Sequence, residues 1–369
     1  MEVGVFKLFL SLVTPLLTFG VACAEQPKIR VALLAPLSGP VAFLGEPIRK
    51  GCTLAHERLA PDIRSQIDFV VKDDQFDTKQ SLSSYRQLES SNRLDVLLVT
   101  GSPPANALAP IVEKKDQILV AIAASDPTIV QGRAKSFIHW VIPPQLATPL
   151  VDELLRRDFA RIALVASEVS GAIADIEAVK SDLTKRGEGA RVVYEATFGR
   201  EVLDFKGALS AMKGRKVDVV VAVLFPPAVS AFAKQLRQLL PGVGLVGMET
   251  LEDSSEVTAA QGALEGAWYA NAADATGGFA ELYKERWGEL PGIASGNGYD
   301  VIQMLGAAVA AGNVKVTEIA RYLRGIQGFK GAAGDYGASG DNRFTLPPAL
   351  KMIKEGKFVP YSFPSAGPK

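Results

Sequence analysis

The stretch over residues 94–126 constrains the fold of this chain most, because it predicts a strand, a helix and a second strand in close succession. Residues 94–100 form an apolar run short enough to be a buried strand of a parallel sheet. Gly101 and Ser102 interrupt this run, and the two prolines that follow suit the first turn of a helix. The second predicted strand, residues 118–123, is soon followed by Ser125. Both serines should therefore lie at the carboxyl edge of one sheet, where ligands of open α/β sheets bind.

These two serines, Ser102 and Ser125, allow two interpretations. A hydroxyl beside the free amides of a helix N-terminus suits a small anion such as a carboxylate. Alternatively, both serines merely cap helices, which is the commoner role of a serine in this position. Because two such serines meet at one sheet edge, the sequence keeps both interpretations open.

The rest of the chain continues this alternation of short apolar runs and helical patterns. A first series has predicted strands over residues 29–35, 67–71, 94–100, 118–123 and 137–141, with helices over 43–59, 78–91 and 105–115. A second series has strands over 161–166, 191–197, 217–224 and 243–247, with helices over 148–157, 173–185, 204–212 and 228–240. This order predicts an α/β fold with two doubly wound parallel sheets.

The last third of the chain suits a return to the first sheet. Helices are predicted over residues 278–288, 297–311 and 316–324. The turn-rich segment 331–342 is suited to a crossover, and residues 350–358 predict a hairpin around Glu355 and Gly356.

The N-terminal residues 1–24 predict a cleaved signal peptide. Lys7 precedes an apolar run over residues 8–21, and Ala22-Cys23-Ala24 fits the small-x-small rule of signal peptidase. Cys23 could instead be the cysteine of a lipoprotein, but Gly20 stands where leucine is expected, so cleavage after Ala24 is favoured. After cleavage Cys52 is the remaining cysteine, and its helical spacing from Ile48 and Ala55 predicts that it is buried.

The charge balance and the missing motifs argue for binding of a small solute. Lys plus Arg and Asp plus Glu both number 40, which disfavours nucleic acid or an anionic membrane surface as a partner. The two histidines, His56 and His139, are far apart, and no metal-binding, nucleophile or nucleotide motif is present. Asp73 and Asp74 are adjacent, so we expect them to order a turn rather than share a proton. No cofactor, metal or enzymatic activity is expected.

Several short motifs together resemble the type I periplasmic solute-binding proteins, and among them the leucine/isoleucine/valine-binding proteins of branched-chain amino acid ABC importers. The motifs are Ser38-Gly39-Pro40-Val41-Ala42-x-x-Gly45, Lys72-Asp73-Asp74, Gly101-Ser102, Ala123-Ala124-Ser125, Pro347-Pro348-Ala349-Leu350 and Gly356-Lys357-Phe358. Their order and spacing cover nearly the whole chain after residue 24.

The resemblance implies a monomer of two α/β lobes that close over one ligand about three hinge crossovers. The crossovers are expected near residues 141–145, 270–273 and 337–343. Lobe 1 would then contain residues 25–143 and 272–340, and lobe 2 residues 144–271 and 341–369.

The resemblance also implies a ligand site. Ser102 and Ser125 would hold the ligand carboxylate with main-chain groups of Gly101 and Ala123, Glu249 would pair with an α-ammonium group, and Phe225 and Leu44 would pack against the ligand.

Departures from the family pattern leave the ligand open. Leu44 stands where an aromatic residue is frequent, and residues 167–170 lack an expected tyrosine. The more apolar pocket also suits an aromatic carboxylate or keto acid, which needs no ammonium partner. Glu249 could instead be a loop acid that faces water beside Glu252 and Asp253. The function expected is a periplasmic solute-binding protein that delivers an amino acid or aromatic acid to a membrane permease; a sensory ligand-binding module is the alternative.

Overall fold

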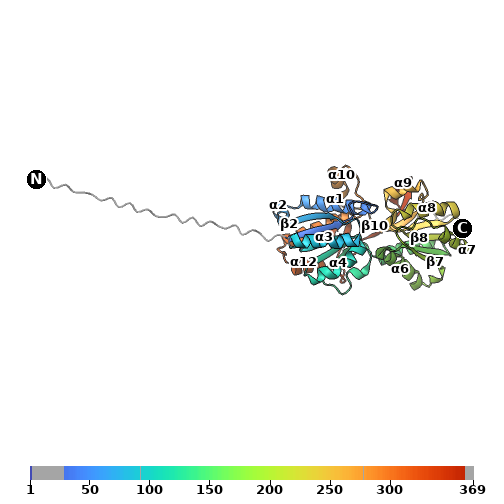
Figure 1. Cartoon of the computed structure of the whole chain (residues 1–369), viewed down its shortest axis with the longest axis horizontal. Helices are drawn as coiled ribbons and strands as arrows, with labels where there is room; N and C mark the ends of the chain where they lie inside the picture. Colours follow the sequence, from blue (N-terminus) through green and yellow to red (C-terminus); the bar gives the residue numbers. More distant parts are fainter. Residues whose placement is uncertain (2–28, 92, 277, 362–369) are drawn as a thin grey trace.

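The computed structural model describes residue 1 and residues 29–91, 93–276 and 278–361, which form two α/β lobes side by side (Figure 1). Apart from Met1, the predicted signal peptide over residues 1–24 lies outside these ranges. Within them, no helix is both long and apolar enough to cross a membrane. The prediction of an α/β fold with two mainly parallel sheets is confirmed.

The first lobe is built on a five-stranded parallel sheet with the order β2-β1-β3-β4-β5. Its strands are β1 (Ile29–Ala35), β2 (Ile67–Asp73), β3 (Val96–Thr100), β4 (Ile118–Ile122) and β5 (Ser136–His139). The helices of this part are α1 (Ala42–Arg58), α2 (Pro61–Arg64), α3 (Thr78–Ser91), α4 (Ser102–Lys114) and the short η1 (Pro127–Ile129). Every residue of β3 and β4 is buried, as the continuous apolar runs predicted.

The second lobe is built on a seven-stranded sheet with the order β14-β13-β10-β9-β8-β6-β7. Its strands are β6 (Ile162–Ser167), β7 (Val192–Phe198), β8 (Val219–Val223), β9 (Gly244–Gly247), β10 (Trp268–Ala272), β13 (Pro348–Lys354) and β14 (Lys357–Pro360). Its helices are α5 (Pro143–Arg156), α6 (Ser170–Lys185), η2 (Gly189–Arg191), α7 (Lys206–Gly214), α8 (Ala228–Leu239), η3 (Glu249–Leu251) and α9 (Ser254–Ala260). β13 and β14 are antiparallel, so this sheet is mixed at one edge. The predicted hairpin is confirmed, with Glu355 and Gly356 at φ 52° and 69° in its turn.

The helix α5 begins earlier than predicted. The sequence predicted a start at residue 148, but the helix begins at Pro143. Pro143 and Pro144 occupy its first turn, where the missing N–H groups cost nothing because those positions have no intrahelical acceptor.

The chain from α10 (Phe279–Trp287) onward returns to the first lobe, as predicted. It adds α11 (Ser295–Ala310), α12 (Val316–Arg324) and the small hairpin β11 (Phe329–Gly331) and β12 (Gly334–Tyr336). The helices α1 and α11 pack closely because glycines face backbone at the contact. A Cβ added to Gly51 would lie 2.0 Å from the Ser295 carbonyl oxygen, and one added to Gly298 would lie 2.6 Å from that of Ile48. Cys52 is fully buried at this contact, which confirms the prediction for it.

The chain passes between the two lobes three times: from β5 to α5, from β10 to α10, and from β12 to β13. The last passage lies a few residues later than predicted, because residues 342–344 run beside β5. The amide of Ile138 donates to the Asn342 carbonyl, and the amide of Phe344 donates to the Ile138 carbonyl. We therefore propose that lobe 1 contains residues 29–142 and 273–345, and lobe 2 residues 143–272 and 346–361.

Candidate functional site

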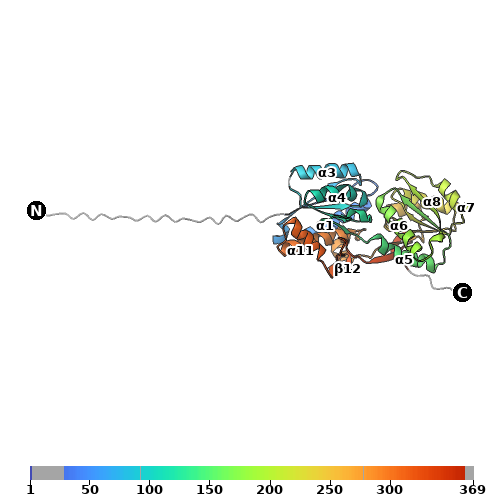
Figure 2. The same cartoon turned by 90° about the horizontal axis from the view of Figure 1, so that it is seen from below.

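A small cavity lies between the lobes, at the carboxyl ends of strands from both sheets. Figure 2 shows α4 and α6, whose N-termini border this cavity, facing one another across the boundary. All seven residues that the sequence predicted for the site line this one cavity. The lining residues are Phe43, Leu44, Phe76, Gly101, Ser102, Ala123, Ser125, Val169, Gly171, Ala172, Phe225, Glu249, Thr250 and Ile293.

Ser102 links the two neighbouring strand ends of the first lobe. Its Oγ accepts hydrogen bonds from the amide of Ser125 at 3.0 Å and from the amide of Asp126 at 3.2 Å. With both lone pairs engaged, the hydroxyl can act only as a donor, and no described residue accepts its proton. Such a hydroxyl at the wall of a cavity is suited to an anionic oxygen.

The capping interpretation of the two serines is wrong in this structure. Gly101 is the N-cap of α4, and Ser102 is already its first residue. The N-cap of η1 is Asp126, whose side chain accepts from the amide of Thr128, so Ser125 does not cap it either. Gly101 is required at its position, because its φ is 79° and a Cβ there would lie 2.3 Å from the ring of Phe76.

Aromatic rings from both lobes close one side of the cavity. Phe76 follows β2, Phe225 follows β8, and their rings stack with centroids 5.6 Å apart. The Arg200 guanidinium lies over the Phe76 ring at 5.2 Å. The sequence did not predict Phe76 or Arg200. Phe76 is held by the predicted acidic turn, since its amide donates to Asp74 Oδ1 at 3.0 Å.

Glu249 begins η3, directly after β9, and points its carboxyl group into the protein. Its Oε2 is buried and accepts no well-formed hydrogen bond among the described residues, and the polar side chain that acts on it is that of Asp175. Burial raises the pKa of Glu249 from 4.5 to about 6. The side chain as a whole is half-buried and lines the cavity, so Glu249 is not the fully solvent-facing loop acid of the alternative interpretation.

Asp175 is a second buried acid near this site, and sequence reasoning missed it. It lies on α6, is fully buried, and accepts no well-formed hydrogen bond among the described residues, although the side chains of Glu249 and Ser125 lie close enough to act on it. Burial and the nearby charge of Glu249 raise its pKa well above the usual value for an aspartate. One feature of the sequence could have identified it: Asp175 is an acid on the apolar stripe that Ala172, Ile176 and Val179 form along α6.

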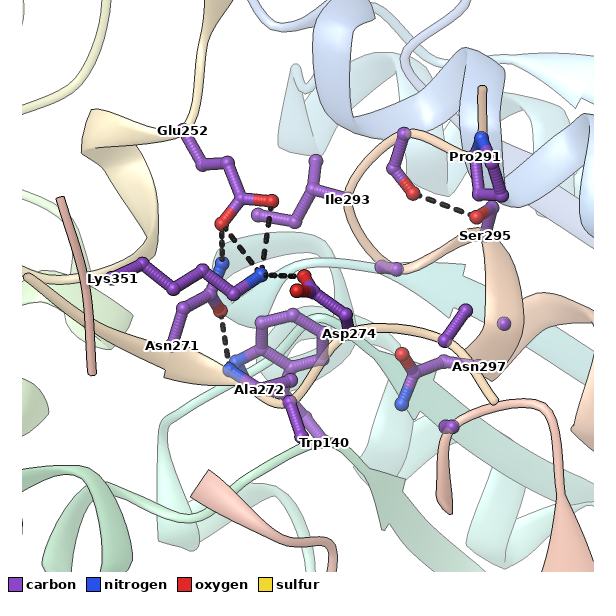
Figure 3. A pocket seen from close by; sticks show the side chains of 16 residues that line it. Trp140, Glu252, Asn271, Ala272, Asp274, Pro291, Ile293, Ser295, Asn297 and Lys351 are labelled. Carbon is purple, nitrogen blue, oxygen red and sulfur yellow. Dashed lines mark hydrogen bonds and ion pairs between the residues drawn. The ribbon is translucent and has the colours of Figure 1, made fainter. Parts of the chain in front are cut away.

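A different pocket lies beside the crossovers and is shown in Figure 3. The charged groups that line it form ion pairs with one another. Lys351 Nζ lies 3.1 Å from Glu252 Oε2 and 2.6 Å from Asp274 Oδ1, and Asn271 donates to Glu252 at 2.7 Å (Figure 3). These groups join β13, β10 and the crossover after β10. The cavity with Ser102 and Glu249 is therefore the better candidate site, because its polar groups still lack partners.

The sequence matches the periplasmic binding protein family over residues 28–352. The chain belongs to this family. As a periplasmic binding protein it binds a ligand rather than catalysing a reaction, which confirms the prediction that it is not an enzyme. Among curated proteins, the Leu/Ile/Val-binding protein BraC3 of Rhizobium johnstonii is 23% identical over 253 residues, which are 67% of this chain and 68% of that protein.

Solved structures share the fold of this periplasmic binding protein at low sequence identity. The leucine-binding protein LivK of Thermotoga maritima matches with a TM-score of 0.84 at 19% identity, over 90% of this chain and 98% of that one. An ABC transporter solute-binding protein of R. palustris in complex with benzoate matches with a TM-score of 0.79 at 22% identity, over 90% and 95% of the two chains.

Proposed function

We propose that this periplasmic binding protein is the substrate-binding component of an ABC importer for a hydrophobic or branched-chain amino acid. It would be exported by cleavage after Ala24 and would deliver its ligand to a membrane permease. The family membership and the names of the relatives support this role.

The proposal depends on one observation: the same cavity contains a hydroxyl suited to an anionic group and a carboxyl group suited to a cationic one. Ser102 presents a hydroxyl that can only donate, and Glu249 presents a buried carboxyl oxygen that is not paired with a basic side chain among the described residues. A zwitterion satisfies both, because its carboxylate accepts from the hydroxyl and its ammonium donates to the acid. Ser125 and the main chain of Gly101 and Ala123 would complete the carboxylate site, and Leu44 and Phe225 would pack on the side chain.

An aromatic carboxylate or keto acid is the second candidate. Phe43, Phe76 and Phe225 line the cavity, and a related structure was solved in complex with benzoate. Such a ligand would use the serine end alone. It would leave Glu249 buried without a cation, a state that costs free energy unless the acid is protonated.

Calorimetric titration of the mature protein, unfolded and refolded to remove bound ligand, separates these candidates. The titrants are leucine, 4-methylpentanoate and a phenyl keto acid. 4-Methylpentanoate keeps the side chain and carboxylate of leucine and lacks only the ammonium group. We expect leucine to bind at least about a hundredfold more tightly than 4-methylpentanoate, because loss of one partner from a buried ion pair costs about 3 kcal/mol or more.

Equal affinities for leucine and 4-methylpentanoate would contradict the ammonium site. Binding of the phenyl keto acid alone would make the protein an aromatic acid carrier.

Gly171 offers a test of the proposed lobe closure around the ligand. It lies on α6 of lobe 2, and a Cβ added there would lie 2.9 Å from Ser102 Oγ of lobe 1. Because two hydrogen bonds hold Ser102 in place, the added methyl group should keep the lobes apart. We expect Gly171→Ala to weaken ligand binding by about tenfold, or about 1.4 kcal/mol, with little change in the free energy of unfolding.

Gly207→Ala is the matched control, because this helical glycine of the same lobe has no atom within 4 Å of an added Cβ. If Gly171→Ala binds like the control in titration calorimetry, the two lobes do not close as tightly as proposed.

A further inference from the structure

Asp175 lies on the face of α6 that points toward the proposed ligand cavity. It follows Gly171 by one helical turn, and Gly171 lines the cavity opposite Ser102 and Ser125. Asp175 is fully buried, its carboxyl oxygens accept no well-formed hydrogen bond, and the polar side chains that act on it are those of Glu249 and Ser125. A buried acid in this state costs free energy unless it binds a proton or a cation.

No described basic side chain acts on Asp175; Arg200 lies over the rings of Phe76 and Phe225, which line the cavity, and is not among the groups that act on Asp175. Glu249 is the charged group whose field acts on Asp175. The charged groups on neighbouring elements have other partners: Asp152 with Arg186, Glu153 with Arg156 and Arg157, Lys180 with Glu195, Arg191 with Asp158 and Glu188, Glu113 with the amides of Ala134 and Lys135, and Asp126 with Asn106 and Thr128. The two acids therefore face one another without a compensating charge from these groups.

Ionising both Asp175 and Glu249 in the ligand-free protein costs free energy. Burial disfavours the charged form of each; the charge of Glu249 further disfavours ionisation of Asp175, whereas the hydrogen bond from protonated Asp175 favours the charged form of Glu249. Acids coupled in this way lose their protons in two separate steps, so the pair retains one proton over an intermediate pH range.

We propose that Asp175 and Glu249 share one proton in the ligand-free protein and exchange it for the ammonium group of the ligand. This inference rests on the proposed amino acid ligand. The shared proton leaves to solvent, both carboxyl groups become carboxylates, and the ammonium group binds Glu249 at the cavity wall, with the Asp175 carboxylate behind it. The exchange keeps the net charge of the pair and its bound cation at minus one before and after binding. A carboxylate without an ammonium group cannot make this exchange, so Asp175 would act with Glu249 to reject simple carboxylates.

The sign of the pH dependence follows from this exchange. Since binding releases a proton, a rise in pH favours binding. Over the range in which the pair retains its proton, the affinity for leucine should increase by up to about tenfold for each unit of pH.

Titration calorimetry with leucine at pH 7, above the pKa of about 6 for Glu249, in buffers of different ionisation enthalpy counts the released protons. The slope of the observed enthalpy against the buffer enthalpy should correspond to about one proton for the wild-type protein. Asp175→Asn removes the second acid and keeps its shape. This variant should release far fewer protons, because Glu249 is then ionised before the ligand binds, and should bind leucine at least tenfold more weakly.

Glu177→Gln is the control, since Glu177 is an exposed acid on the same helix. It should release as many protons as the wild-type protein. Leucine binding by the wild-type protein without proton release would overturn the shared proton, as would unchanged release by Asp175→Asn, and either result would leave the proposed function standing. No binding of leucine at all would overturn the proposed function and this inference together.

Discussion

Glu249→Gln is expected to reverse the ligand preference of the cavity. In the wild-type protein the Glu249 carboxyl group lies at the cavity wall with a buried oxygen that is not paired with a basic side chain among the described residues. An ammonium group would gain a charged partner there, whereas a simple carboxylate would approach a like charge. Glutamine keeps the size of the side chain and removes the charge. We expect leucine to bind a hundredfold or more less tightly, about 3 kcal/mol or more, because a buried ammonium loses its charged partner.

A second ligand that lacks only the ammonium group of leucine tests whether the loss is due to the ammonium site. 4-Methylpentanoate should bind Glu249→Gln as tightly as it binds the wild-type protein, or more tightly, because its carboxylate no longer meets a second negative charge. Titration calorimetry of both ligands gives the comparison. Glu168→Gln, at an exposed acid of the same lobe, controls for the loss of one negative charge and should bind leucine normally. Parallel losses for both ligands in Glu249→Gln would show that Glu249 only supports the shape of the cavity.

The sequence predicted the parts of this site that depend on local order along the chain. Strand ends of parallel sheets meet at one edge, so Ser102 and Ser125 could be placed together without coordinates. The hydrogen bonds of these serines could not be predicted, because the contact between Ser102 Oγ and the amide of Ser125 depends on the loop conformation after β4. The capping interpretation was wrong for that reason: it treated each serine only within its own segment.

The residues that the sequence missed come from elements that meet only in the folded chain. Asp175 lies on an otherwise apolar helix stripe, and nothing in its segment shows that Glu249, far along the chain, lies beside it. Phe76 becomes a wall of the cavity because Asp74 fixes its amide and Phe225 of the other lobe meets its ring. Pairings between lobes depend on how the lobes are oriented, which local patterns do not encode.

A buried acid away from the cavity, Asp300 on α11, is expected to decide the stability of the first lobe. Asp300 is 1% exposed and accepts three hydrogen bonds, from the amides of Ala332 at 2.7 Å and Ala333 at 2.9 Å and from the hydroxyl of Tyr336 at 2.8 Å. It thereby holds the β11–β12 hairpin against α11. Asp300→Ala leaves these donors unsatisfied, so we expect a loss of about 3 kcal/mol in the free energy of unfolding, measured by urea denaturation of the ligand-free protein.

The pH dependence of the free energy of unfolding tests whether Asp300 makes this contribution. Burial raises its pKa from 3.8 to about 6, so the folded state holds a proton that the unfolded state releases between these values. The contribution of Asp300 to stability should therefore fall as the pH rises from about 4 to about 6. Asp300→Asn cannot titrate, so the stability difference between the wild-type protein and this variant should shrink over the same range. Asp335→Asn, at an exposed acid of the same hairpin, should follow the wild-type curve. A difference between the wild-type protein and Asp300→Asn that stays constant with pH would show that Asp300 is ionised throughout, and that its hydrogen bonds outweigh the cost of burial.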